Sequence, residues 1–124
     1  MATVVTNVGL SIITNRLKGV GGAEPNWIDW GTDATAAAAT DTTMGTPGGE
    51  ARVAGTSSQE TTAQTSDTYQ VVGTMTESGG GASISEAGLF DANVAGNMFI
   101  SADFTPVVLA NSESIQFTFK VQFS

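Results

Sequence analysis

The sequence predicts a mainly β domain, an antiparallel β-sandwich or jelly-roll-like fold with a short N-terminal helix. Three observations support this. Ser and Thr make up 29 of the 124 residues, there are 15 glycines, and only 13% of residues are charged, so good helix formers are scarce. Several β-rich runs are separated by Gly, Asn and Asp turn signals. The last run alternates strictly, with apolar residues at Ile115, Phe117, Phe119, Val121 and Phe123. We expect one sandwich domain over residues 1–124, with roughly six to eight strands.

The N-terminal segment, residues 4–18, fits two interpretations. Val4, Thr6, Val8, Leu10 and Ile12 alternate as in a strand, whereas Val5, Gly9, Ile13 and Leu17 recur every four residues as in a helix. Thr6 or Asn7 could cap the start of a helix, and Gly19 stands where a terminating glycine belongs. We therefore favour a helix that covers one open end of a sheet.

The middle of the chain predicts short strands separated by long polar loops. Residues 26–31 form a compact strand candidate, and residues 52–54 form a brief one. Residues 32–49 and 55–67 are rich in Ala, Thr, Ser and Gly, and we expect both to be loops or arms. Loops this long are either mobile or lie against something else.

The second half predicts a clearer succession of strands. Residues 68–76 form a β-rich run, and glycines 79–81 make a flexible turn after it. A β-hairpin follows, with strands over 82–90 and 97–105 joined by a turn at 91–96. Pro106 is expected to interrupt the second strand before the short apolar segment 107–109.

The composition excludes many functions. There is no histidine and no cysteine, so imidazole bases, thiolate nucleophiles, disulfides and His- or Cys-ligated zinc are excluded. The formal net charge is −8 and only four cations are present, so nucleic acid and anionic membranes are unexpected partners. No apolar run approaches a membrane span, and the start lacks the features of a secretory leader. We expect synthesis in a host cytoplasm.

Carboxylates are the only candidates for acid–base chemistry. Asp29 with Asp33, or Glu86 with Asp91, could form a glycosidase pair, but dispersed solvated carboxylates are the simpler interpretation. No calcium-loop motif occurs, and the glycines at 19, 21 and 22 lack the Lys-Ser/Thr of a phosphate loop. We predict no enzyme activity, no metal and no cofactor.

Two further features admit alternative interpretations. Trp27 and Trp30 could stack on a sugar, but residues three apart on a strand point to opposite faces, so packing of one in the core and the other under a loop is favoured. Glu86 could discourage aggregation at a sheet edge, or it could accept hydrogen bonds from loop amides or a basic residue such as Arg52. Gly88 permits close approach of another backbone or a bulge.

A set of motifs in this order resembles a known family. They are TNVGL, WIDWGTD, TDTTMGTPGGEARV and SISEAGLFDANVAGNMFISADFTPV, followed by the strand of alternating aromatics. This succession resembles a small β domain of tailed-bacteriophage virion proteins, in which the pattern I-[ST]-E-x-G-L-F-D precedes a short turn, a glycine and a strand ending F-x-P-V. Residues 84–107 are the most specific part of the resemblance.

The resemblance implies a structural role on the virion. A free-standing domain of this kind is expected to be a capsid decoration, or cement, protein on the capsid surface, a homotrimer that binds the major capsid protein. The helix, the N-terminal segment or the polar loops would touch the shell. Our hypothesis for the contact residues is Trp27, Trp30, Thr56, Ser57, Ser58, Glu86 and Phe90. The alternatives are a tail-fibre, collar or baseplate subunit, or a carbohydrate-binding module.

Overall fold

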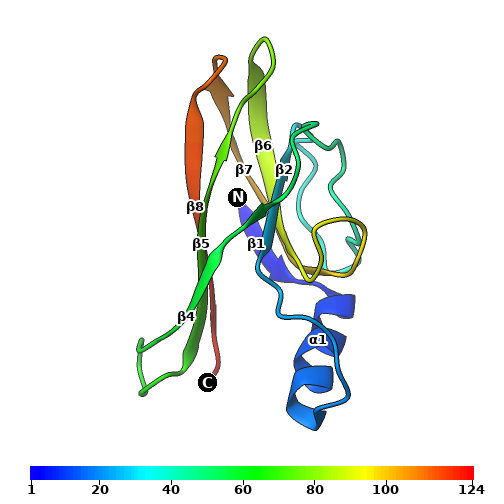
Figure 1. Cartoon of the computed structure of the whole chain (residues 1–124), viewed down its shortest axis with the longest axis vertical. Helices are drawn as coiled ribbons and strands as arrows, with labels where there is room; N and C mark the ends of the chain where they lie inside the picture. The colour runs from blue at the N-terminus through cyan, green and yellow to red at the C-terminus, as the bar shows by residue number, and fades with distance from the viewer.

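The computed structural model describes all residues, 1–124, as two facing antiparallel sheets with one helix at one end (Figure 1). The larger sheet has the order β1 (Ala2–Val5), β7 (Met98–Leu109), β6 (Ala82–Phe90), β2 (Trp27–Gly31) and β3 (Val53–Ala54). The smaller sheet has the order β4 (Thr56–Glu60), β5 (Thr68–Thr76) and β8 (Ser114–Gln122). Helix α1 (Asn7–Lys18) extends below the larger sheet, beside the lower part of the smaller sheet. The predicted mainly β, sandwich-like fold with a short helix is confirmed.

The core lies between the two sheets. Strand β8 alternates as predicted: its odd-numbered residues are buried or half-buried and its even-numbered residues are exposed. Trp30 of β2 is fully buried, and its ring meets Phe117 of β8 edge-to-face with centroids 6.3 Å apart. Val71 and Met75 of β5 are also fully buried on the inner face. Contacts of this kind join the sheets into one hydrophobic core.

The β6–β7 hairpin is confirmed, but Pro106 does not end its second strand. Strand β7 continues to Leu109, and the β6–β7 register shifts between Ile84 and Glu86, opposite the region of Pro106. Strand β1 pairs only with residues 100–103 of β7, so Pro106 lies beyond its reach at an open edge. Proline is tolerated there because an open edge or a bulge does not require its missing N–H.

The prediction that residues 55–67 form a loop is wrong for its first half. Residues 56–60 form β4, which pairs with β5 over five residues, and only the segment that follows is a turn. Its sequence, TSSQE, carries no hydrophobic alternation, so the strand is specified by the unpaired edge of β5 rather than by its own side chains. Residues 53–54 form the expected brief strand, β3.

Residues 32–49 form the predicted loop, and it lies against the molecule's own larger sheet (Figure 1). Met44 from this loop is buried with Phe90 and Met98 in a second, smaller cluster on the outer side of that sheet. Because the loop covers this side, β6 is buried on both faces from Ile84 to Phe90. A central strand that is covered on both faces has consecutive buried residues rather than alternating ones.

Both interpretations of the N-terminal segment apply, each to a different part. Residues 2–5 form β1, and the preferred helix follows from Asn7 to Lys18. Thr6 is the N-cap, with its side chain accepting a hydrogen bond from the amide of Gly9, and Gly19 ends the helix with a positive φ of 73°. The capping prediction is therefore confirmed, and the helix projects from one end of the larger sheet (Figure 1).

Candidate docking site

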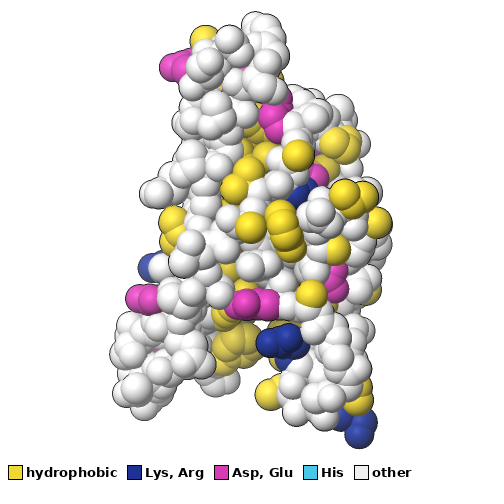
Figure 2. All heavy atoms as spheres, viewed as in Figure 1, with side chains coloured by type: hydrophobic (Ala, Val, Ile, Leu, Met, Phe, Trp, Pro, Cys, Tyr) yellow, Lys and Arg dark blue, Asp and Glu magenta, His cyan; other side chains and the backbone are white.

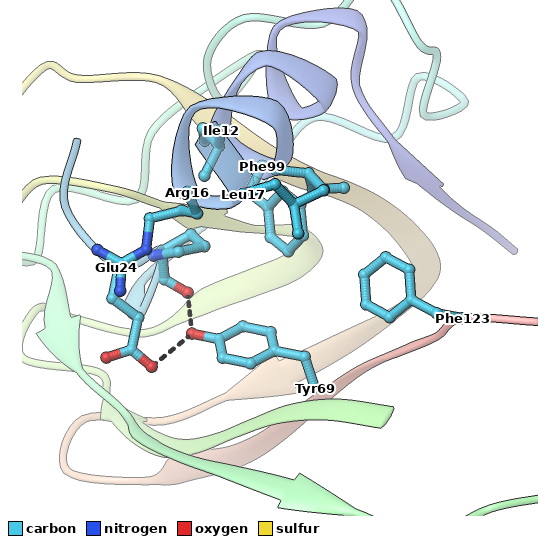
Figure 3. Close-up of a pocket in the computed structure, with 9 residues that line it drawn as sticks. Ile12, Arg16, Leu17, Glu24, Tyr69, Phe99 and Phe123 are labelled. Carbon is cyan, nitrogen blue, oxygen red and sulfur yellow. Dashed lines mark hydrogen bonds between the residues drawn. The ribbon is translucent and has the colours of Figure 1, made fainter. Parts of the chain in front are cut away.

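A cleft opens at the end of the molecule where α1 projects beside the lower part of the smaller sheet (Figure 2). We call it the base cleft. It has a volume of about 270 Å³. Figure 3 shows that its walls come from α1, from β5 and from the C-terminal segment after β8. The lining residues are Ile12, Ile13, Arg16, Leu17, Glu24, Pro25, Tyr69, Phe99 and Phe123.

Helix α1 is held rigidly against the sandwich at its N-terminal end. The fully buried Thr6 donates a side-chain hydrogen bond of 2.6 Å to the carbonyl of Met98, and its amide donates to the carbonyl of Phe99 at 3.0 Å. A Cβ at Gly9 would lie 2.6 Å from the carbonyl oxygen of Phe99, so only glycine allows this close approach. The buried Ile12 then anchors the next turn in the core. These contacts fix the first part of α1, and Ile12 contributes to the wall of the base cleft from there.

Tyr69 forms the floor of the base cleft and joins it to the loop after α1. Its hydroxyl lies 2.9 Å from the carbonyl oxygen of Pro25 and 3.1 Å from Oε1 of Glu24, and these two acceptors share its single proton (Figure 3). Burial, with the neighbouring Glu24 carboxylate as a second cause, raises the pKa of Tyr69 well above its usual 10.0. Arg16 donates from Nη1 to the carbonyl of Gly22, which folds the loop back toward the helix. The polar groups at this end thus fix the loop and leave the cleft wall apolar.

Exposed apolar side chains gather around the base cleft. Leu17 is 83% exposed, and Phe123, on the opposite wall, is 48% exposed. Leu10 lies two turns before Leu17 on the same side of α1 and is 54% exposed, and Val20 directly after the helix is 59% exposed. Together these four residues form what we call the apolar rim. Leu17 and Phe123 line the base cleft itself, and exposed apolar side chains at a cleft are typical of a protein docking site.

Glu86 accepts hydrogen bonds from loop amides, as one of the two interpretations predicted. Its carboxylate accepts from the amides of Asp33 at 3.1 Å, Gly45 at 2.8 Å and Thr46 at 2.8 Å. The residue is only 8% exposed and lies on β6, a central strand, so the alternative of an edge strand is wrong. Glu86 therefore fixes the loop 32–49 on the sheet.

The other carboxylates proposed for a catalytic pair are also hydrogen-bonded within the fold. Asp29 forms an ion pair with Arg52 at 3.3 Å, and hydrogen bonds from the side chain and amide of Thr35 hold the pKa of Asp33 below its usual 3.8. Asp91 accepts from the amide of Asn97 at 2.7 Å and so closes the β6–β7 turn. These contacts assign the four carboxylates structural roles, and the absence of enzyme activity stays a prediction.

Arg52 links three parts of the larger sheet's outer side. Besides its ion pair with Asp29, its guanidinium lies 3.6 Å from the ring centroid of Phe90 and donates to the carbonyls of Ala92 and Ala95. Arg52 was a predicted alternative hydrogen-bond donor to Glu86, but its carboxylate partner is Asp29. A guanidinium can serve this many acceptors because its donors form a planar fork.

The two tryptophans lie in different hydrophobic clusters, as their spacing predicted. Trp30 belongs to the main core and donates from Nε1 to Glu50 at 2.7 Å, whereas the half-buried Trp27 packs on the small cluster around Met44. They do not form one flat surface. This arrangement matches the favoured interpretation of one tryptophan in the core and one beneath a loop.

The residues of the contact hypothesis do not form one surface. Trp30 and Phe90 are 0% and 1% exposed, and Glu86 is occupied by the loop amides. Accessible surface remains on Trp27 and on Thr56, Ser57 and Ser58 of β4. Contact through these four residues stays a prediction, as does the homotrimer. The base cleft was not foreseen, and the one signal for it in the sequence was the i, i+7 pair Leu10 and Leu17.

Neither similarity to known proteins nor a metal-binding cluster assigns a function to this chain. No family model, no curated protein and no solved structure matches the chain. No group of three or more acidic side chains is arranged to hold a metal ion. The single helix is too short and too polar to cross a membrane. The candidate site therefore rests on the geometry of the base cleft.

Proposed function

We propose that this chain is a structural protein of a tailed-bacteriophage virion, a decoration protein that binds the major capsid protein and stabilises the shell. One structural observation carries the proposal: a cleft with an apolar rim at one end of a small, strongly acidic domain. The sequence resemblance supplies the class of partner. The helix and the C-terminal segment, which border the cleft, supply the contact.

The physical chemistry of the base cleft suits a protein partner. Burying Leu17, Val20 and Phe123 removes apolar surface from water, at about 25 cal/mol for each Å². Because the start of α1 is already fixed by Thr6 and Gly9, the helix need not be ordered when a partner covers the rim. The net charge of −8 opposes capture of DNA by the same surface. A protein that binds the assembled shell stabilises that assembled state by mass action.

Binding to shells tests the proposal directly. Leu17→Ser and Phe123→Ser should each reduce occupancy of purified shells assembled without this protein, and the double variant should bind least. Val94→Ser is the matched control because Val94 is 75% exposed but lies in the turn between β6 and β7, away from the base cleft. Leu17→Ser and Val94→Ser should keep the wild-type unfolding temperature, since both side chains are largely exposed. Phe123 is half-buried, so the occupancy of Phe123→Ser is compared at a temperature at which its unfolding curve shows it folded.

The outcome separates the docking surface from the function. Equal occupancy for all variants would remove the base cleft as the docking surface. Failure of the wild-type chain to bind shells, with unchanged heat resistance of the particles, would remove the decoration function itself. A tail-fibre, collar or baseplate subunit would instead be found in a few or tens of copies per particle, rather than hundreds.

A carbohydrate-binding module remains the alternative from another functional class. Trp27 is the tryptophan with accessible surface, so sugar binding should change its fluorescence and should be lost in Trp27→Ala. Trp30→Ala would remove a fully buried ring and test stability instead.

A further inference from the structure

Strand β8 is the longest regular free edge in the molecule. It pairs with β5 on one side over nine residues without a register shift, and no strand pairs with its other side. The other edges are short or interrupted: β3 has two residues, β1 four and β4 five, and the open part of β7 contains Pro106. Natural proteins blunt free edges with proline, bulges, short strands and charges, and β8 has no proline or bulge and one charge, Lys120.

A groove lies along this edge, between the two sheets. It has a volume of about 820 Å³ and runs from β8 to the opposite edge formed by β1 and β7. Phe104 and Val107 line one side of it, and Ile115, Phe117 and Phe119 line the other. Ile115, Phe117 and Val121 are only half-buried, so the core of the sandwich is incompletely covered here. A further strand beside β8 would continue the smaller sheet and cover these residues.

The charge distribution favours a second copy of this acidic chain at that edge. The protein carries 12 carboxylates, yet from residue 104 to residue 124 the only one is Glu113. Two copies, each with a net charge of −8, repel one another over most of their surfaces. They can approach most closely where carboxylates are absent, and β8 itself contains none.

We infer that two copies of this chain pair through β8 in antiparallel orientation, about a two-fold axis at Thr118. In this register Phe117 faces Phe119 of the second copy and Ile115 faces Val121, so apolar side chains meet on the inner face. On the outer face Thr118 faces its own counterpart, Gln116 faces Lys120, and Ser114 faces Gln122. No like charges lie opposite one another, and all nine residues of each strand are paired.

The self-complementary order of side chains distinguishes this partner from others. In a two-fold interface, a residue that lies a given number of positions before the axis in one copy faces the residue that lies the same number of positions after it in the other copy. The two must fit each other. Strand β8 meets this requirement at every position around Thr118. Inner-face residues face inner-face residues, and outer-face residues face outer-face residues. The two smaller sheets would then form one continuous sheet of six strands. A homotrimer, which the resemblance implies, would need two unlike surfaces and would not use this pairing.

A lysine at the axis tests the pairing without touching the core. Thr118 is exposed on the outer face, so Thr118→Lys should fold normally but place two lysines opposite each other, beside Lys120. Sedimentation equilibrium should show a dimer for the wild-type chain and a dissociation constant raised about fivefold or more in the variant. Thr74→Lys is the matched control: Thr74 is exposed on β5, one strand away from the free edge of β8, and its replacement should leave the dimer unchanged.

Single cysteines then test the register, since the chain contains none of its own. Thr118→Cys should form a disulfide-linked dimer on mild oxidation, because the axis places the two sulfurs opposite each other. Gln122→Cys should not, because its counterpart would lie about 27 Å away along the strands. A 1:1 mixture of Gln122→Cys and Ser114→Cys should link.

Each alternative result overturns the inference. A wild-type monomer at millimolar concentration, a trimer, or equal cross-linking of Thr118→Cys and Thr74→Cys would exclude pairing through β8. A dimer that cross-links through Gln122→Cys alone would place the axis elsewhere. None of these results bears on shell binding by the base cleft, so this inference and the proposed function fail separately.

Discussion

Replacing Glu86 by glutamine should loosen the loop 32–49 and lower the stability of the whole domain. The carboxylate accepts three amide hydrogen bonds, with Oε1 serving Gly45 and Oε2 serving Asp33 and Thr46. Glutamine keeps the shape of the side chain but offers one accepting oxygen. Its NH₂ group would face the donors of the other oxygen, so one or two of the three hydrogen bonds must be lost.

The expected size of this effect follows from the burial of the site. A hydrogen bond to a charged group contributes about 1.5–3 kcal/mol, and a buried amide left without a partner adds to the loss. Since Glu86 is 8% exposed while the loop itself is partly solvated, we expect the free energy of unfolding to fall by about 3 kcal/mol. For a domain of this size that corresponds to a decrease of roughly 10 °C in Tm.

Urea unfolding followed by tryptophan fluorescence measures the effect, because Trp30 is fully buried in the core. Hydrogen exchange at the amides of Gly45 and Thr46 should accelerate more than exchange at β5. Glu60→Gln, at the end of the edge strand β4, makes the same change of charge and should shift stability by less than about 0.5 kcal/mol. If the two variants lose equal stability, the loss reflects net charge and the assigned role of Glu86 is wrong.

Two further predictions concern titration. Tyr69 is the only tyrosine, so phenolate absorbance reports its titration alone. Its pKa should lie above 10.0 in the folded chain. The stabilisation from this group is fully present below pH 10 and is lost as the pH rises toward the folded pKa. Normal titration near pH 10 by a folded sample would contradict its burial. Asp67 accepts from the amides of Gln64, Thr62 and Ala63, which hold its pKa well below 3.8, so its stabilisation is present above pH 4 and is lost as the pH falls toward the folded pKa. Asp67→Asn should therefore lower Tm more at pH 7 than at pH 2, and equal losses at both pH values would refute this.

The sequence predicted the parts of the fold that local chemistry specifies. The alternation of β8, the Thr6 cap and the terminal Gly19 all concern residues that interact with near neighbours or with one uniform face. Strand β4 was missed because its Ser and Thr residues have no pattern of their own, and it is the open edge of β5 that makes them a strand. Continuation of β7 past Pro106 likewise depends on where β1 ends.

The candidate site depends still more on contacts distant in sequence. The role of Glu86 was predictable as one of two alternatives, but its three donors lie at least 40 positions away. The base cleft brings together Leu17, Tyr69 and Phe123 from three separate elements. Nothing in the local sequence of any one of them indicates that the others are near. The contact hypothesis instead named large aromatic residues, and two of them, Trp30 and Phe90, are buried in hydrophobic clusters of the domain itself.

The two proposed surfaces have a joint consequence for binding to a shell. The base cleft is lined by α1 and Phe123, whereas the proposed dimer uses the edge of β8 that is not paired with β5. One chain can therefore use both surfaces at once. A pair joined through β8 would carry two base clefts related by the two-fold axis. Once the first cleft docks, the second binds at a high effective concentration wherever the shell repeats its site at the same spacing. Thr118→Lys, which leaves each base cleft intact, should therefore weaken binding to whole shells while leaving binding to an isolated capsid subunit unchanged. Equal binding of Thr118→Lys and wild type to whole shells would show that the two surfaces act independently.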